Sequence, residues 1–181
     1  MAEIEEPDQD QEDDPAPLKG EEALELAREG PDAWNAWAEE NPGRVVNFSG
    51  VDFTTEENED IPFEGFTFPG NVNFFGARFK FASFEGTIFK GEVQFNSSTF
   101  EQYSRFDEAT FIGEARFIEA TFEGIVLFIG VTFEKGVNFG GASFKSVAGF
   151  KNAKFKYSAS FNGVTFVGAV DFNLRARLEK S

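Results

Sequence analysis

The 181-residue sequence contains no cysteine and no histidine, and it has a single methionine. Without cysteine the chain can form no disulfide, and it has neither a thiol nucleophile nor a thiolate ligand for a metal. Without histidine it lacks the usual near-neutral general base and the commonest metal ligand. These absences exclude most familiar catalytic and metal-binding arrangements. We therefore expect no enzymatic activity, no cofactor and no metal site.

Long apolar runs are also missing. No stretch approaches the roughly 18 apolar residues of a membrane-spanning helix, and no basic, apolar signal segment stands at the N-terminus. We therefore expect a cytoplasmic protein without a membrane partner. The net charge of −16 is unevenly spread, because residues 1–43 hold 15 acids and two bases whereas residues 44–173 hold 16 acids and 11 bases.

Phenylalanine is abundant, with 26 copies. From Phe106 to Phe172 the phenylalanines follow one another at spacings that alternate between five and six residues. The rule continues back to Phe48 with small slips, so that 23 phenylalanines share one register. A small or β-branched residue, such as Ala109 or Val131, stands two positions before most of them.

An α-helix does not fit this spacing. At about 100° per residue, spacings of five and six would place successive phenylalanines on different stripes of a helix. A single long strand also fails, because side chains alternate between its two faces and a spacing of five would turn every second ring outward. A corner in the chain after each unit keeps both the small residue and the phenylalanine inside.

This unit resembles the repeat of the pentapeptide-repeat proteins, in a Phe-rich variant with alternating spacing, from Val46 to about Asn173. The resemblance implies an all-β fold, a right-handed quadrilateral β-helix with four units to a coil and about six coils. Equivalent residues should then recur every 20 to 22 positions. One expected column of stacked rings contains Phe68, Phe89, Phe111, Phe133 and Phe155.

Residues 1–19 precede the repeats and combine acids with three prolines, a composition typical of a disordered tail. Such a tail is either a solubilising extension or an acidic arm that folds onto a basic partner or covers the rod.

Residues 20–43 predict a helical N-terminal cap. One helix is expected over residues 21–29, and a second from Pro31 to about residue 40. Trp34 and Trp37 share a face of the second helix. They also resemble a Trp-Asn-x-Trp segment that precedes the repeats in many members of the family. We expect this helix to cover the open edge of the β-helix, with a partner-binding tryptophan pair as the alternative.

Two further segments depart from the repeat of residues 44–173. In residues 54–60, Asn58 stands where a phenylalanine belongs, so either this coil bulges out as a loop or Asn58 points inward with a hydrogen-bonded amide. The acids there lack the spacing of a calcium loop. Residues 174–181 place Leu174 and Leu178 on one face, which predicts a C-terminal cap or a dimer contact.

Residues on either side of each phenylalanine should point outward, and most of them are polar. The exceptions form a candidate partner-binding patch, since contiguous apolar surface often marks an interface. It comprises Phe75, Ile112, Ile118, Leu127 and Ile129, with Ile125 at the neighbouring corner. Alternatively, these are apolar side chains that the edges of the rod tolerate and that bind no partner.

We therefore expect a non-enzymatic rod that serves as a protein-interaction or scaffold module in the cytoplasm, and the resemblance implies that the cell is bacterial. Its protein partner is unidentified, and a homodimer formed through a rod end is a further alternative. We expect no direct nucleic-acid binding and no small-molecule substrate. The resemblance implies one alternative, a rod that mimics DNA and modulates DNA gyrase, giving quinolone tolerance. DNA carries about one negative charge per 1.7 Å, so a rod of about 29 Å would need about 17 charges, whereas the repeats have a net charge of only −5.

Overall fold

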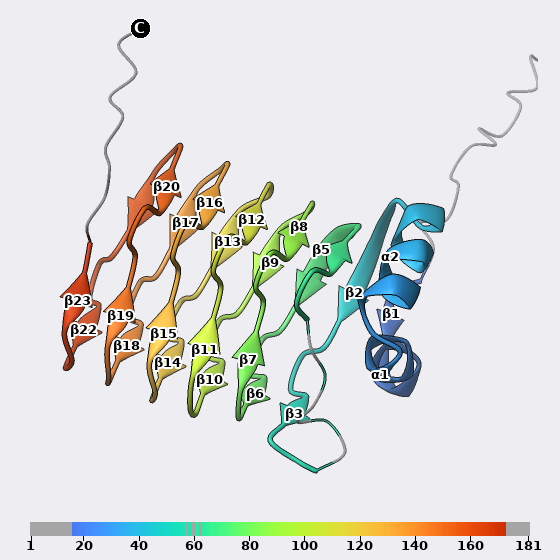
Figure 1. Cartoon of the computed structure of the whole chain (residues 1–181), viewed down its shortest axis with the longest axis horizontal. Coiled ribbons are helices and arrows are strands. Elements are labelled where there is room, and N and C mark those ends of the chain that lie inside the picture. The colour runs from blue at the N-terminus through green and yellow to red at the C-terminus, as the bar shows by residue number, and fades with distance from the viewer. Residues whose placement is uncertain (1–15, 57, 59–60, 62, 173–181) are drawn as a thin grey trace, which may run out of the picture.

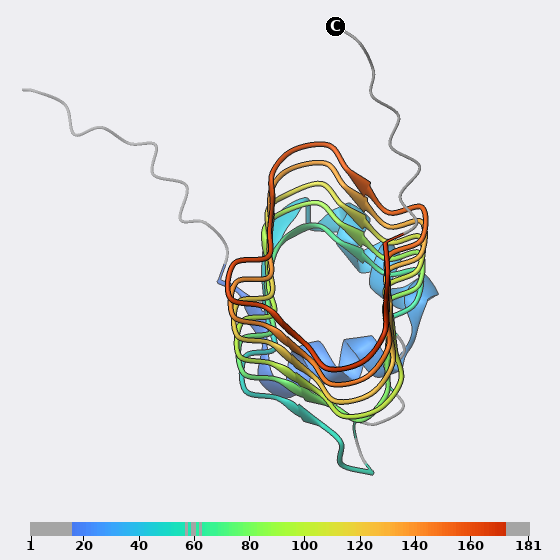
Figure 2. The same cartoon turned by 90° about the vertical axis from the view of Figure 1, so that its left-hand side faces the viewer.

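A computed structural model describes residues 16–56, 58, 61 and 63–172. Two short helices stand at one end, and from there the chain winds into a right-handed, four-sided β-helix of about six coils (Figures 1 and 2). The predicted fold class is confirmed. No helix in the described part of the chain is long and apolar enough to span a membrane.

Each side of the β-helix is a parallel sheet built from the corresponding strands of successive coils. We number these sides in chain order. Face 1 contains β1 (Leu18–Lys19), β2 (Gly43–Asn47), β5 (Gly70–Asn73), β9 (Val93–Gln94), β13 (Ala115–Arg116), β17 (Val137–Asn138) and β21 (Ala159–Ser160). Face 2 contains β3 (Asp52–Phe53), β6 (Arg78–Phe79), β10 (Thr99–Phe100), β14 (Thr121–Phe122), β18 (Ser143–Phe144) and β22 (Thr165–Phe166). Face 3 contains β7 (Ala82–Ser83), β11 (Ser104–Arg105), β15 (Val126–Leu127), β19 (Ala148–Gly149) and β23 (Val170–Asp171). Face 4 contains β4 (Thr67–Phe68), β8 (Ile88–Phe89), β12 (Thr110–Phe111), β16 (Thr132–Phe133) and β20 (Lys154–Phe155).

Columns of stacked phenylalanine rings fill the interior. On face 1, Phe117 stacks on Phe95 and Phe139 with ring centroids 5.0 and 4.9 Å away. Rings from the opposite side meet it edge-on, since Phe106 of face 3 lies 5.6 Å from Phe117 at an interplanar angle of 87°. The expected column through Phe111 is confirmed on face 4 by stacking at every step. The core is therefore solid, as a packed protein interior requires.

The alternating spacing of five and six arises from two kinds of corner. After faces 1 and 3 the chain turns with two residues, and the second has a positive φ, as in Glu108, Glu119 and Gly130. After faces 2 and 4 most corners take three residues, for example the segment between Phe122 and Val126. The two wide corners lie diagonally across the coil, because they follow opposite faces.

The helices α1 (Gly20–Arg28) and α2 (Pro31–Glu40) cover the N-terminal end (Figure 1). Trp34 of α2 is fully buried, and its Nε1 donates to the carbonyl of Thr67 at 3.0 Å. The amide of Thr67 in turn donates to Asn35 Oδ1 at 2.7 Å. Since β4 is the edge strand of face 4, α2 satisfies backbone groups that would otherwise stay open to pairing.

One expected boundary is wrong. Leu18 and Lys19, assigned from sequence to the tail, form β1, which pairs with β2 in the register Leu18 to Val46. Leu18 is 2% exposed and belongs to the core. A two-residue strand next to prolines leaves no periodic signal, and it forms because face 1 offers it an open edge. Residues 1–15 of the expected tail and the expected C-terminal cap at 174–181 lie outside the described residues.

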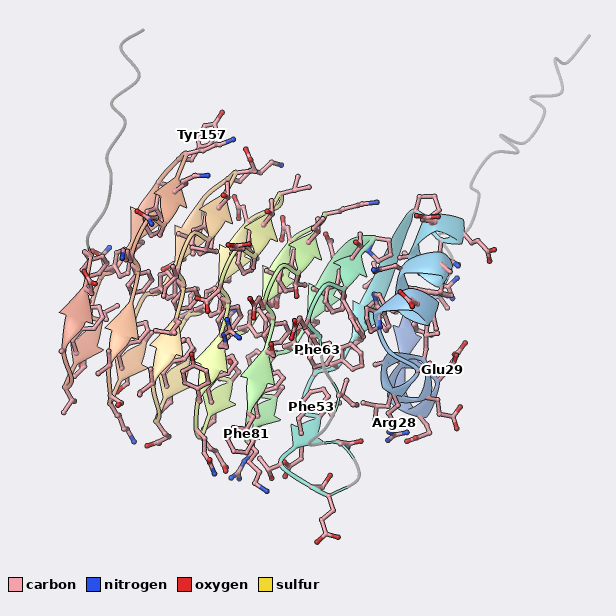
Figure 3. All side chains as sticks on the ribbon, viewed as in Figure 1. Arg28, Glu29, Phe53, Phe63, Phe81 and Tyr157 are labelled. Atoms are coloured by element: carbon pink, nitrogen blue, oxygen red, sulfur yellow. The ribbon has the colours of Figure 1, made fainter. Side chains whose placement is uncertain are left out.

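The described residues between β3 and β4 leave the regular path after Phe53 (Figure 1). Asn58 donates from Nδ2 to the carbonyl of Asp52 at 3.2 Å and accepts at Oδ1 from Arg28 Nη2 at 2.7 Å. Figure 3 shows Arg28 facing this loop, while Phe53 and Phe63 point into the core. Both readings of the segment therefore hold in part, since the coil bulges and the Asn58 amide is hydrogen-bonded.

Candidate interaction surface

Because aromatic rings fill the interior, the candidate site lies on the outer surface. A shallow hollow opens at the corner between faces 4 and 1, and its lining includes Ile112, Lys135 and Tyr157. It is open to solvent and is not an enclosed pocket. Among the residues that the structure describes, no group of three acids is placed to hold a metal ion.

Asp107 illustrates how acids serve the fold. Asp107 and Glu108 are adjacent acids, but the carboxylate of Asp107 is not a solvated surface charge. Asp107 is 7% exposed, accepts a hydrogen bond at Oδ1 from the amide of Ile129 at 2.9 Å, and pairs through Oδ2 with Arg105 Nε at 3.0 Å. Its carboxylate ties one coil to the next, which leaves no free pair of acids for acid–base chemistry here.

The five residues of the predicted patch surround the coils and do not share one face. Phe75 and Ile118 follow strands of face 1 and lie at the corner between faces 1 and 2, two coils apart. Ile112 lies at the corner between faces 4 and 1, and Leu127 on β15 of face 3. Ile129 lies at the corner between faces 3 and 4, diagonally opposite Ile118. The structure thus brings together only Phe75 with Ile118, in one column.

A different row of apolar side chains follows one edge of the rod. At the wide corner between faces 2 and 3, Phe81, Tyr103, Ile125 and Val147 occupy equivalent places in four successive coils. The amide of the residue after each of the first three donates a hydrogen bond of 2.9 to 3.3 Å to the carbonyl of the next residue in the row, and these bonds fix the register. The four are between 40% and 52% exposed, and Figure 3 shows Phe81 pointing away from the core. We call these four residues the apolar ridge.

The diagonally opposite corner shows that the fold does not require apolar residues here. The corresponding hydrogen bonds between faces 4 and 1 place Glu92, Glu114, Gly136 and Ser158 in the equivalent column. The two columns occupy equivalent places in the coil, yet the column between faces 2 and 3 is apolar and the one between faces 4 and 1 is polar. An exposed apolar row that folding does not demand is a candidate contact surface.

Charged pairs flank the apolar ridge. Arg105 bridges Glu85 at 2.6 Å and Asp107 at 3.0 Å on face 3, and Lys145 bridges Glu123 at 2.7 Å beside face 2. The hydrogen bond to Asp107 raises the pKa of the Arg105 guanidinium above its usual value. An apolar centre with a polar, ion-paired rim is the usual anatomy of a protein interface.

Sequence reasoning reached this row only in part. Ile125 was noted at a corner, and Leu127 lies beside it on β15, with its side chain against Gly149 of the next coil. The expectation covered only the immediate neighbours of each phenylalanine. It therefore missed Tyr103 and Val147, which stand three residues after a phenylalanine, and Phe81, which stands two residues after Phe79. Tyr103, Ile125 and Val147 recur every 22 residues at that third position, which is a signal that the sequence does contain.

Comparison with known proteins agrees with the geometry. Residues 95–143 and 128–173 match a family described as pentapeptide repeats (9 copies). No curated protein sequence matches the chain significantly.

Proposed function

Because this chain belongs to the pentapeptide-repeat family, whose solenoids are generally non-catalytic, we propose that it is a non-enzymatic rod that binds a protein partner along the apolar ridge. The supporting observation is the contrast between the two wide corners, since only one of them carries four exposed apolar side chains. The rod acts as a rigid interaction or scaffold module.

The spacing of the ridge favours one shape of partner. Successive coils are about 4.8 Å apart, so four ridge residues span about 14 Å. An amphipathic helix presents an apolar residue about every 5.4 Å along its axis, and four such residues span about 16 Å. A helix lying along the ridge therefore keeps its apolar stripe against all four side chains. Because stacked rings hold the ridge in place, binding orders little of the rod.

DNA mimicry finds less support. The acids are confined to one part of the rod, because residues 44–134 hold 15 acids and six bases whereas residues 135–172 hold one acid and five bases. Duplex DNA presents negative charge evenly along its length. Potent inhibition of gyrase supercoiling by the purified protein would overturn this ranking.

The C-terminal end of the rod supports a second contact. Phe172 is 39% exposed, and Phe155, Phe161 and Phe166 are half-buried, whereas the rings of the inner coils are almost fully buried. A homodimer through this end would cover these rings. Light scattering coupled to gel filtration over a range of concentrations tests this contact independently of the ridge.

A triple comparison tests the ridge. The first variant changes Phe81 and Ile125 to Ser, and the control changes Glu92 and Glu114 to Ser at the opposite corner. Proteins captured from native lysate by the wild type are identified by mass spectrometry, and the affinity of the purified partner is then measured for each form. We expect the ridge variant to bind at least tenfold more weakly and the control to bind normally.

A third variant separates the ridge from the predicted patch. Ile118→Glu with Ile129→Glu charges two corners away from the ridge. We expect it to retain partner binding. Loss of binding in this variant, with normal binding by the ridge variant, would move the site to the patch.

A further inference from the structure

Charge is segregated along the rod. Beyond Glu134 the described chain contains five lysines and a single acid, Asp171. The protein as a whole has a net charge of −16, so this end is an exception that composition alone conceals.

Four of the five lysines lie on face 4 or at its two corners. Lys154 points outward from β20, Lys151 stands at the corner before this strand, and Lys156 follows it. Lys135 belongs to the preceding coil and lines the same surface hollow as Tyr157, which Figure 3 shows projecting from the outer end of face 4. All four lysines are exposed. We call them the lysine surface.

Most of this positive charge is unpaired. Lys156 is neutralised by Glu134, whose two carboxylate oxygens lie 2.7 and 2.8 Å from Nζ. Within the described part of the chain, Lys135, Lys151 and Lys154 have no acid within ion-pair distance. The arginines of the earlier coils differ, since Arg78, Arg105 and Arg116 each pair with at least one acid. The lysine surface is thus suited to an anionic ligand with several charges.

We propose that the lysine surface binds the acidic residues 1–14 of the same chain. These residues carry eight acids and no base. The chain enters the fold at β1, on the open edge of face 1, which adjoins face 4. From β1 to the strand β21 is six strand spacings, about 29 Å, and 14 extended residues span about 46 Å. The arm therefore reaches the surface within one molecule.

The covalent link to the rod favours residues 1–14 over a free anionic ligand. Single exposed ion pairs are weak, but a linked segment is present at an effective concentration in the millimolar range. A nucleic acid offers similar charge, yet it would approach a molecule of net charge −16 from solution. The proposal is independent of the apolar ridge, which lies on the other side of the coil.

The absence of cysteine makes a direct test possible in the full chain. A spin label on Ala2→Cys is the only labelled thiol. At about 50 mM salt we expect it to broaden the amide signals of residues 151–157 and of Lys135 selectively. At about 0.5 M salt, where the screening length is only a few Å, the broadening should fall at least fivefold.

Two variants and one control complete the test. Changing Lys135, Lys151 and Lys154 to Ser should abolish the broadening, as should Glu12→Gln with Asp13→Asn and Asp14→Asn, which changes only the arm. Lys145→Ser removes a paired lysine near face 2 and should change nothing. Broadening that survives both triple variants, or that is absent at low salt, overturns the proposal.

Mixing experiments exclude the competing occupants. If broadening appears in isotope-labelled protein only when a separate spin-labelled copy is added, the arm binds between molecules and the intramolecular proposal is wrong. If a single-stranded oligonucleotide shifts the lysine signals while the spin label leaves them unchanged, the surface belongs to nucleic acid instead.

Discussion

At the corner between faces 4 and 1, single glycines set how closely the coils approach. A Cβ built on Gly113 would overlap the backbone of Gly91 and Glu92, and a Cβ on Gly91 would overlap Gly70 and Asn71. At Gly91 and Gly113 the neighbouring backbone occupies the space of any side chain. The next two coils carry Lys135 and Tyr157 in the same place, so this close approach is confined to the coils that contain Gly70, Gly91 and Gly113.

We expect Gly113→Ala to lower the free energy of unfolding by about 1–3 kcal/mol, because the backbone has to shift to admit the methyl group. Gly136→Ala is the matched control, since the nearest atom to its added Cβ would be the movable Ser158 Oγ at 3.3 Å. Urea denaturation followed by circular dichroism compares the two. Equal midpoints for both variants would contradict the close approach at Gly113.

Asp52 gives a residue-scale prediction on pH. Hydrogen bonds from the Thr54 hydroxyl at 2.7 Å and the Thr54 amide at 2.9 Å hold the pKa of this carboxyl below its usual value. Folding therefore favours the ionised form, and the resulting stabilisation is present above the unfolded pKa and is lost as pH falls through the folded pKa. We expect Thr54→Val to raise the pKa of Asp52, as measured by NMR titration of the carboxyl carbon. An unchanged titration would refute the role of the hydroxyl.

Among the elements, α2 closes the first coil. Trp34 stacks on Phe66 at 5.0 Å and contacts Phe68 edge-on at 5.2 Å, which extends the aromatic column by one ring. Asn35 bonds to this edge twice, since its Oδ1 accepts from the Thr67 amide and its Nδ2 donates to the Gly65 carbonyl at 3.0 Å. The helix thus replaces the missing preceding coil in both packing and hydrogen bonding.

We expect Trp34→Ala to destabilise the protein by about 3–5 kcal/mol, the usual cost of truncating a large buried aromatic residue. Opening the edge should also cause concentration-dependent association. Trp37→Ala is the control, because Trp37 is only partly buried and should cost less than half as much. Chemical denaturation and light scattering measure the two effects. If both variants stay equally stable and monomeric, α2 is not a cap.

Across the whole molecule, each coil contacts its neighbours and nothing else, so stability is close to a sum of local terms. The two ends are unequal. The N-terminal coil is covered by α1 and α2, whereas the last coil leaves its rings partly exposed in the described structure. Opening should therefore begin at the C-terminal end.

Hydrogen exchange tests this asymmetry. We expect the amides of Thr165 and Val167, which bond to the preceding coil, to exchange at least tenfold faster than those of Thr121 and Glu123 in the middle of the rod. Mass spectrometry or NMR after dilution into deuterated buffer gives the rates. Uniform protection along face 2 would show that the end coil is as stable as the centre.

The sequence determined the architecture almost completely, because each unit repeats one solution to the same packing problem. The spacing of the phenylalanines sets the number of corners, and the small residue before each ring sets which side chains face inward. Confirmed stacking through Phe111 and Phe117 follows from that pattern alone. Local rules suffice where every contact partner lies one coil, or about 22 residues, away.

Only the tertiary structure decided how the outer side chains are grouped. Ile118 and Ile129 lie in one coil by sequence, yet the coil carries them to opposite corners, whereas Phe81 and Val147 are 66 positions apart and share one edge. The pairing of Leu18 with Val46 and the burial of Asp107 likewise depend on which strand or turn lies beside them. The repeat period and the composition determine which residues fill the interior of the solenoid. Which outer side chains become neighbours depends on the face or corner that each residue occupies in the folded coil.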